Sequence, residues 1–196
     1  RAAKNGKIQK LAGFGKKRYI YKAAMAVGKD YFTGIAGMRG IGKTVLLLQM
    51  ASAKENSVYF SADASYLQGN SMYEVIGSLR RQGFGNIFID EIHTNPDWAA
   101  EVKTIYDEHE VRLFFSGSSS MKIRQSGADL SRRAVIMEMK GTSFREYLSF
   151  SKGIEIGLPA LATVSKTTPF FSSNETLFFG ILAMQLLLAL AISMPA

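Results

Sequence analysis

The sequence of 196 residues contains no cysteine and only two histidines, His93 and His109. The absence of cysteine excludes disulfide bonds and thiolate metal sites. Two histidines argue against a protein-built zinc site, so we expect no zinc. No signal-peptide pattern is visible, and because the first residue is Arg1 we expect further residues upstream. The composition permits a reducing compartment, and we expect the protein to be cytoplasmic.

Acidic residues are nearly missing from the first thirty positions. This stretch holds nine lysines and arginines against a single acidic residue, Asp30, while the remaining fifteen basic and fifteen acidic residues cancel. The net charge of +8 is therefore a property of the amino-terminal end. We interpret residues 1–30 as a basic arm or helix that contacts nucleic acid or an anionic membrane surface. A solvated basic face is the alternative.

Short apolar runs alternate with helical patterns through the middle of the chain. The strands are expected at 31–36, 57–63, 86–91, 111–117 and 134–139. Helices are expected at 43–53 and 72–82, then after Asn95 as N-cap with Pro96 as first helical residue, and after a capping box of Ser143 and Glu146. This alternation predicts an α/β fold, in which a parallel sheet of about five strands is covered by helices on both faces.

A glycine-rich loop stands between the first predicted strand and the helix after it. The stretch 37–44 reads GMRGIGKT and fits the phosphate-binding loop pattern. Glycines let successive backbone N–H groups point inward, and the positive end of the following helix faces the anion. The residues expected to hold the phosphates are Gly37, Arg39, Gly40, Ile41, Gly42, Lys43, Thr44 and Val45. A glycine turn before an ordinary helix is the alternative, and Arg39 could instead pin the loop through a neighbouring carboxylate.

Two carboxylates close the strand expected at 86–91, which reads NIFIDE. We expect Asp90 to hold Mg²⁺, through water, together with the hydroxyl of Thr44. Glu91 is expected to orient or deprotonate an attacking water, and Lys43 to reach the β- and γ-phosphates. A surface turn explains many Asp-Glu pairs. The phosphate loop in the same predicted sheet favours the functional interpretation here.

Other polar residues are candidates for the reaction itself. Ser116 ends the next predicted strand, where it could sense the γ-phosphate or hold the water, or cap a helix instead. Arg132 and Arg133 are candidates for an arginine finger, in cis or from a neighbouring subunit, although paired surface arginines often have no such role. We interpret His93 as a helix-entry or core histidine rather than a catalyst.

Six short motifs together resemble one known family. GMRGIGKT, YFSAD, NIFIDEIH, FFSGSSS, DLSRRAV and SFREYL follow one another as in the prokaryotic AAA-superfamily ATPases, over about residues 19–150. The resemblance implies a P-loop core with an extra strand between the Walker A and Walker B strands, and ATP with Mg²⁺ as ligands. By position it implies Walker A residues Gly37, Gly42, Lys43 and Thr44, Walker B residues Asp90 and Glu91, a sensor at Ser116, and a family arginine at Arg132 or Arg133.

The end of the chain departs from that family. Such relatives continue into a helical or winged-helix region, whereas residues 153–196 carry few charges and end in an uncharged run, Leu177 to Met194. Eighteen helical residues at about 1.5 Å each just reach across a hydrocarbon core of about 30 Å. A membrane anchor, an apolar helix buried on a missing domain or partner, and an unnatural end are the three interpretations. We expect three parts: an arm at 1–30, a P-loop ATPase domain at 31–152, and a linker with an apolar helix at 153–196.

These features lead to one leading hypothesis and several alternatives. The leading one is Mg²⁺-dependent hydrolysis of ATP that drives a conformational change on a partner, with a second copy of the chain among the candidate partners. The first alternative is a switch that binds ATP without appreciable turnover. Nucleotide kinase activity is a weaker one, since no acceptor-site lid is visible. A further alternative places the protein on DNA or at a membrane through its basic arm and apolar tail.

Overall fold

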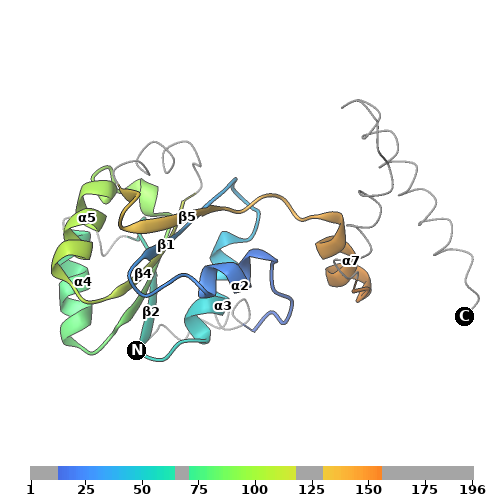
Figure 1. Ribbon diagram of the computed structural model, residues 1–196, viewed down its shortest axis with the longest axis horizontal. Helices are drawn as coiled ribbons and strands as arrows, with labels where there is room; N and C mark the ends of the chain where they lie inside the picture. The colour runs from blue at the N-terminus through green and yellow to red at the C-terminus, as the bar shows by residue number, and fades with distance from the viewer. Residues whose placement is uncertain (1–12, 65–70, 118–129, 156–196) are drawn as a thin grey trace, which may run out of the picture. The chain divides into compact units, whose positions relative to one another are not determined.

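The computed structural model describes residues 13–64, 71–117 and 130–155 (Figure 1). The chain divides into two compact units, Arg1–Lys152 and Gly153–Ala196. The site described below lies in the first unit. None of the described helices is long and apolar enough to cross a membrane. The run Leu177 to Met194, expected to be an apolar helix, lies outside the described residues, so its membrane association stays a prediction.

Five parallel strands form one sheet in the order β2-β3-β4-β1-β5. The strands are β1 (Phe32–Ala36), β2 (Ser57–Ser61), β3 (Asn86–Asp90), β4 (Arg112–Gly117) and β5 (Ala134–Glu138). The predicted α/β class and parallel sheet are confirmed, and β4 is the extra strand that separates β1 from β3. Because the strands are parallel, their carboxyl ends meet at one edge of the sheet. The glycine loop after β1 and Asp90 at the end of β3 lie on that edge.

Helices cover both faces of the sheet because the strand side chains alternate between two apolar cores. Ile87 and Ile89 of β3 pack in one cluster, and Phe88 between them packs in the other. The first cluster includes residues of α4 (Met72–Arg81) and α5 (Trp98–Glu108). The second includes residues of α2 (Ile20–Met25) and α3 (Lys43–Ser52). Figure 1 shows α4 and α5 on one side of the strands and α2 with α3 on the other.

The start of α5 differs from the prediction. Asn95 was expected to cap a helix beginning at Pro96, but α5 begins at Trp98. The Asn95 side chain instead accepts a hydrogen bond from the backbone N–H of Asp97 at 2.9 Å and donates to Glu101 at 2.9 Å. A short 3-10 turn, Ile92–Thr94, precedes it, so Asn95 closes a turn between two helical segments.

The last described helix begins as predicted. The hydroxyl of Ser143 accepts a hydrogen bond from the backbone N–H of Glu146 at 3.2 Å, and Glu146 accepts one from the backbone N–H of Ser143 at 3.0 Å. This reciprocal pair is a capping box, and it opens α7 (Phe144–Lys152). The Glu146 side chain is therefore fixed at the first turn of α7.

The described part of the amino-terminal segment packs against α3. Ile20, Tyr21 and Ala24 of α2 belong to the same core cluster as α3. The amide of Gln49 on α3 donates to the backbone carbonyls of Phe14 at 2.6 Å and Lys16 at 3.0 Å. Burying these apolar side chains gives residues 18–25 a structural role, so part of the basic segment belongs to the core.

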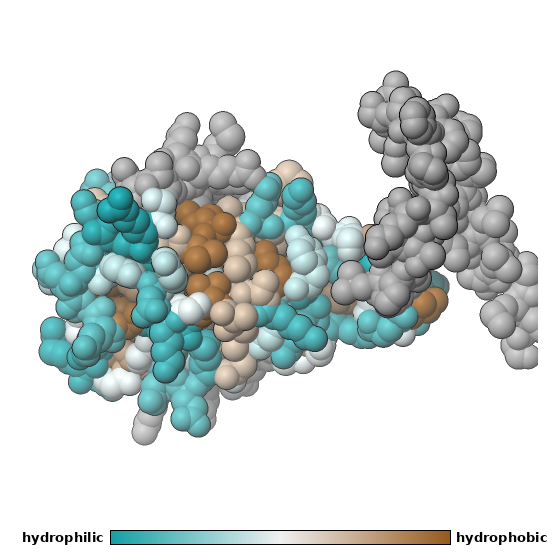
Figure 2. Space-filling model, viewed as in Figure 1, coloured by the Kyte–Doolittle hydropathy of each residue, from teal (hydrophilic) through white to brown (hydrophobic). Residues whose placement is uncertain are grey.

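Figure 2 shows hydrophobic residues in the middle of one face, where Figure 1 places β5 and β1, with hydrophilic residues around them. β5 is an edge strand, and its residues Val135, Ile136 and Met137 are half-buried. The strand β1, which precedes the glycine loop, is thus one strand in from this edge of the described sheet.

Candidate functional site

Three glycines shape the loop between β1 and α3, and for different reasons. Gly40 and Gly42 have φ angles of 83° and 97°, in the left-handed region that favours glycine. At Gly37 a Cβ atom would lie 2.5 Å from the carbonyl oxygen of Met139 and 2.4 Å from the Cδ1 atom of Ile41. The loop therefore depends on glycine for its backbone angles at two positions and for close packing at the third.

Replacing Gly37 by alanine tests this packing. We expect Gly37→Ala to lower the free energy of unfolding by about 2 kcal/mol, because the methyl group overlaps a backbone oxygen that has little room to move. Nucleotide binding should weaken as well. Thermal melting and nucleotide titration measure the two effects. Gly85→Ala is the matched control, since a Cβ there meets nothing within 4 Å. Equal melting temperatures for both variants would contradict the close packing at Gly37.

Lys43 opens α3, and its ammonium group lies against the loop. The side chain is buried, and Nζ donates to the carbonyl oxygens of Gly37 at 3.1 Å and Met38 at 2.9 Å. Burial lowers the pKa of Lys43, and the charges of Glu91 and Asp90 partly offset that effect. A buried cation held by loop carbonyls is ready to meet an anion that enters the loop.

The Asp90 carboxylate gathers donors from four segments. Thr44, next to Lys43, donates its hydroxyl to Asp90 Oδ2 at 2.6 Å, and the Tyr59 hydroxyl donates to the same oxygen at 3.0 Å. The Ser116 hydroxyl and the backbone N–H of Glu91 donate to Oδ1. Asp90 is only 3% exposed, so these donors replace the hydrogen bonds that water would otherwise give its oxygens. The structure thus brings together three residues predicted for the site: Thr44, Asp90 and Ser116.

Tyr59 was not predicted as a site residue. β2 pairs with β3 so that Ser61 lies beside Asp90, and Tyr59, two residues earlier, faces the same way. Burial first, and then the charge of Asp90, raise the pKa of the Tyr59 hydroxyl well above its usual range, so the group remains a donor. The sequence predicted β2 as a strand, but it did not show that β2 pairs with β3, which is what brings Tyr59 to Asp90.

Glu91, which follows Asp90 in the chain, lines a cavity. The cavity has a volume of about 310 Å³ and is lined by Arg39, Asp63, Glu91, His93 and Thr94. Glu91 adopts a φ of 52°, which is uncommon for a residue with a side chain and is typical of functional positions. Its Oε2 lies 3.6 Å from Nδ1 of His93. The geometry leaves room for a ligand in front of Glu91 and Arg39.

The arginine-finger candidates lie elsewhere. Arg133 precedes β5, and the next residue, Ala134, pairs with Phe32 at the start of β1, the opposite end of the strand from the loop. Its guanidinium binds Asp107 through two contacts of 3.0 Å each. Arg132 beside it is exposed. The structure therefore does not bring Arg133 to the loop of its own chain, and a finger role requires a neighbouring subunit.

The donor set fits Mg²⁺ bound together with phosphate. A threonine hydroxyl and a carboxylate are hard oxygen ligands, and Mg²⁺ in such sites takes its remaining ligands from phosphate and water. Within residues 13–64, 71–117 and 130–155, no group of three or more histidine and acidic side chains is arranged to hold a metal ion. Both the Thr44–Asp90 pair and the lack of a larger cluster among the described residues are consistent with a Mg²⁺ site that has two protein ligands and completes its coordination with bound phosphate.

The arrangement is that of a P-loop nucleotide-binding protein. It has a glycine loop after the first strand, a buried lysine at the start of the next helix, and a hydroxyl bonded to a carboxylate at the same edge of the sheet. The AAA domain family matches residues 29–148 of this chain. The chain therefore belongs to the AAA domain family, and that membership indicates nucleotide binding. The predicted resemblance to the AAA superfamily is confirmed.

The chain is similar to a curated protein and to solved structures, among them the following two. The uncharacterized protein MJ1637 of Methanocaldococcus jannaschii is 32% identical over 133 residues, which are 61% of this chain and 28% of that protein. PCH-2 of C. elegans has a TM-score of 0.47 at 14% identity, over 87% of this chain and 49% of that one. AMPPCP-bound DnaA from Aquifex aeolicus has a TM-score of 0.43 at 14% identity, over 76% and 54% of the two chains. This chain thus spans only part of each.

Proposed function

We propose that this chain binds ATP with Mg²⁺ and hydrolyses its terminal phosphate to drive a conformational change on a partner. The observation that carries the proposal is the 2.6 Å hydrogen bond between Thr44 and Asp90. It joins the end of the glycine loop to the end of β3, so the two motifs predicted to bind phosphate and metal share one edge of the sheet.

In this proposal each group of the site has one task. Backbone N–H groups of the glycine loop and the Lys43 ammonium bind the β- and γ-phosphates. Thr44 and Asp90 hold Mg²⁺, which when bound neutralises charge on the phosphate oxygens. Ser116 and Tyr59 keep the Asp90 carboxylate in place through their hydroxyls. Arg39, which lines the cavity with Glu91, is positioned to contact a phosphate.

The reaction needs a water molecule and a base beside the γ-phosphate. Glu91 accepts a proton from that water as the water oxygen bonds to the γ-phosphorus. The bond between the γ-phosphorus and the bridging oxygen breaks, and its electron pair stays on the β-phosphate oxygen, so ADP and inorganic phosphate result. Glu91 is suited to this task because it lines an open cavity while Asp90 beside it is almost fully buried.

The wider role rests on the basic arm, part of which lies outside the described residues, and on a second copy of the chain. The basic arm is proposed to contact nucleic acid or an anionic membrane, and residues 1–12 hold four of its nine basic side chains. A second copy of the chain is a candidate partner, since it could supply Arg132 or Arg133 in trans. Salt-sensitive binding lost on removal of residues 1–12 would support the contact with an anionic polymer.

The test of the proposed function is turnover by the whole chain. We expect steady release of phosphate from ATP with Mg²⁺, and none when EDTA removes the metal ion, since the charge on the phosphate oxygens is then no longer neutralised. Phosphate release with both ATP and GTP, and titration of a fluorescent ATP analogue, are the measurements. Binding of ATP without phosphate release would favour the switch instead, and no binding of either nucleotide would overturn both.

A further inference from the structure

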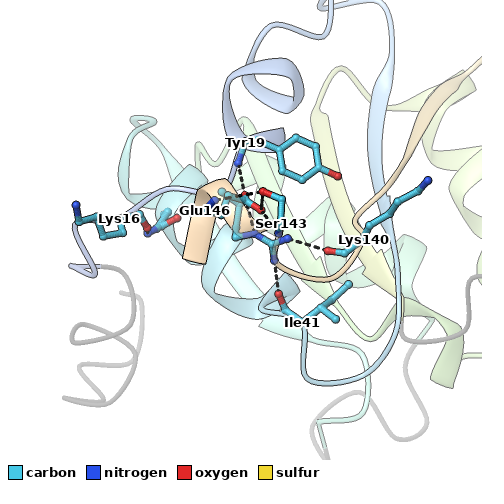
Figure 3. Close-up of polar contacts among 8 residues, drawn as sticks. Lys16, Tyr19, Ile41, Lys140, Ser143 and Glu146 are labelled. Atoms are coloured by element: carbon cyan, nitrogen blue, oxygen red, sulfur yellow. Dashed lines mark hydrogen bonds and ion pairs between the residues drawn. The ribbon is translucent and has the colours of Figure 1, made fainter. Parts of the chain in front are cut away.

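A buried arginine that sequence analysis counted only as part of the basic arm joins the glycine loop to α7. Arg18 is 9% exposed, and its guanidinium makes three separate contacts. Nε donates to Oε1 of Glu146 at 2.9 Å, Nη1 to the carbonyl oxygen of Ile41 at 2.6 Å, and Nη2 to the carbonyl oxygen of Lys140 at 2.7 Å. Figure 3 shows Ile41, Lys140 and Glu146 converging on this point from three parts of the chain.

These contacts need the shape of arginine as well as its charge. A guanidinium is planar and presents its N–H groups in a rigid fork, so one side chain can hold three oxygens in fixed directions. A lysine ammonium is a compact charge at the end of a flexible stem. Lysine at position 18 could keep the ion pair with Glu146 but not all three contacts at once.

The contact with Ile41 acts on the orientation of the loop backbone. Ile41 stands between Gly40 and Gly42, whose φ angles are both positive, so this is the part of the loop with the greatest conformational freedom. A trans peptide points its carbonyl and its N–H in opposite directions. Because the Ile41 carbonyl is held towards Arg18, the N–H of Gly42 points away from it. A loop that binds phosphate through inward N–H groups requires such a fixed peptide.

The contact with Glu146 ties the same guanidinium to the start of α7. Oε1 of Glu146 also accepts from the backbone N–H of Tyr19 at 2.8 Å, and Oε2 is used in the capping box with Ser143. Burial raises the pKa of Glu146, but the bonds from Arg18 and the backbone N–H groups outweigh it and the pKa is lowered. Glu146 is therefore charged at neutral pH, and the ion pair is buried on both sides.

The segment between β5 and α7 completes the connection. Met139 donates its backbone N–H to the carbonyl oxygen of Ala36 at 2.7 Å, directly before the loop. Lys140, the next residue, accepts from Arg18. The base of the loop, its middle at Ile41 and the first turn of α7 are thus held by one set of buried and partly buried hydrogen bonds. A shift of the Ile41 peptide would change the guanidinium position and with it the contact to Glu146.

We propose that Arg18 is a positioning residue that holds the phosphate-binding loop in its anion-binding conformation and couples it to the first turn of α7. The proposal rests on the nucleotide binding proposed above. Coupling between two sites is reciprocal, so a nucleotide in the loop stabilises the start of α7, and an ordered α7 raises the affinity for nucleotide. α7 is the last element of the unit Arg1–Lys152, so the coupling extends to the carboxyl-terminal end of that unit.

The first test compares Arg18→Lys with Arg80→Lys in the full chain. Arg80 is exposed and pairs with Glu110 at 2.7 Å, so it is a matched arginine–glutamate pair on the surface. We expect Arg18→Lys to raise the Kd for ATP with Mg²⁺ about tenfold in folded protein, and Arg80→Lys to leave it unchanged. A purely structural role would lower the melting temperature but leave the Kd of the folded molecules unaltered, and that result would overturn the proposal.

The second test uses hydrogen exchange on the wild-type chain, so it does not depend on a variant that folds. The backbone N–H groups of Glu146 and Tyr147 both donate to Ser143 in the first turn of α7. We expect ATP with Mg²⁺ to slow exchange of these two amides about threefold. ATP binding with no change at α7 would overturn the coupling and leave the proposed function standing. A wild-type chain that binds no nucleotide would overturn the proposed function, and this inference with it.

Discussion

Replacing Glu91 by glutamine is expected to lower the rate of phosphate release by 100-fold to 10,000-fold while ATP still binds with nearly unchanged affinity. That range is typical for loss of a general base. Glutamine keeps the size and shape of the side chain, but its neutral amide cannot accept the proton of the attacking water. The bond from the backbone N–H of residue 91 to Asp90 does not involve the side chain, so the Asp90 arrangement should persist.

The measurement pairs phosphate release with titration of a fluorescent ATP analogue on the same samples. Glu110→Gln serves as the control, because the Glu110 side chain is 91% exposed and forms a surface ion pair with Arg80. We expect this variant to match the wild type in both assays. A Glu91→Gln variant that releases phosphate at the wild-type rate would rule out Glu91 as the base.

The sheet was largely predictable because its apolar runs are short and separated by clear helical patterns. A buried parallel strand needs a continuous apolar run, and NIFID in β3 is one, so its existence and type could be predicted. The family resemblance implied only the extra strand between β1 and β3; the rest of the strand order was not predicted, since pairing depends on contacts far apart in sequence. The start of α5 was harder to predict, because the Asn95 side chain forms its hydrogen bonds in a turn before the helix, and tertiary contacts decide that choice.

The candidate site divides in the same way. Lys43, Thr44 and Asp90 could be predicted because a short motif requires each residue type at a given spacing. Tyr59 and Arg18 could not, because their partners lie 31 and 128 residues away. A basic residue in a basic segment carries no sign that it will be buried. Arg18 was counted as charge for an external partner, and the structure uses it internally instead.

Arg133 was predicted as a candidate for the site, but the structure places it away from the loop. A pair of arginines after the fourth strand fits a catalytic finger by position in the family. In the structure the guanidinium of Arg133 binds Asp107 of α5, which covers one face of the sheet. The hydrogen bond to Asp107 raises the pKa of Arg133 and lowers that of Asp107. Because Arg133 directly precedes β5 and the sheet is parallel, Arg133 lies at the amino end of that strand, opposite the edge that holds the loop.

The Lys43→Met variant is expected to weaken binding of ATP with Mg²⁺ by about 10-fold to 100-fold. A charge-assisted hydrogen bond contributes about 1.5–3 kcal/mol, and each 1.4 kcal/mol is tenfold in Kd. Methionine keeps the apolar stem that lies in the buried position, so the helix start of α3 should survive. Stability should fall only modestly, by about 1 kcal/mol, because the Gly37 and Met38 carbonyls lose one donor each.

The control for this variant is Lys103→Met, on the exposed side of α5, which removes the same charge far from the loop. Isothermal titration calorimetry on both variants separates a local contact from a general effect of net charge. If both lost affinity equally, the attraction would come from the overall basic charge of the protein. If neither did, the ammonium group would not contact the phosphates. A loss confined to Lys43→Met identifies the loop as the place where the triphosphate exchanges water for protein donors.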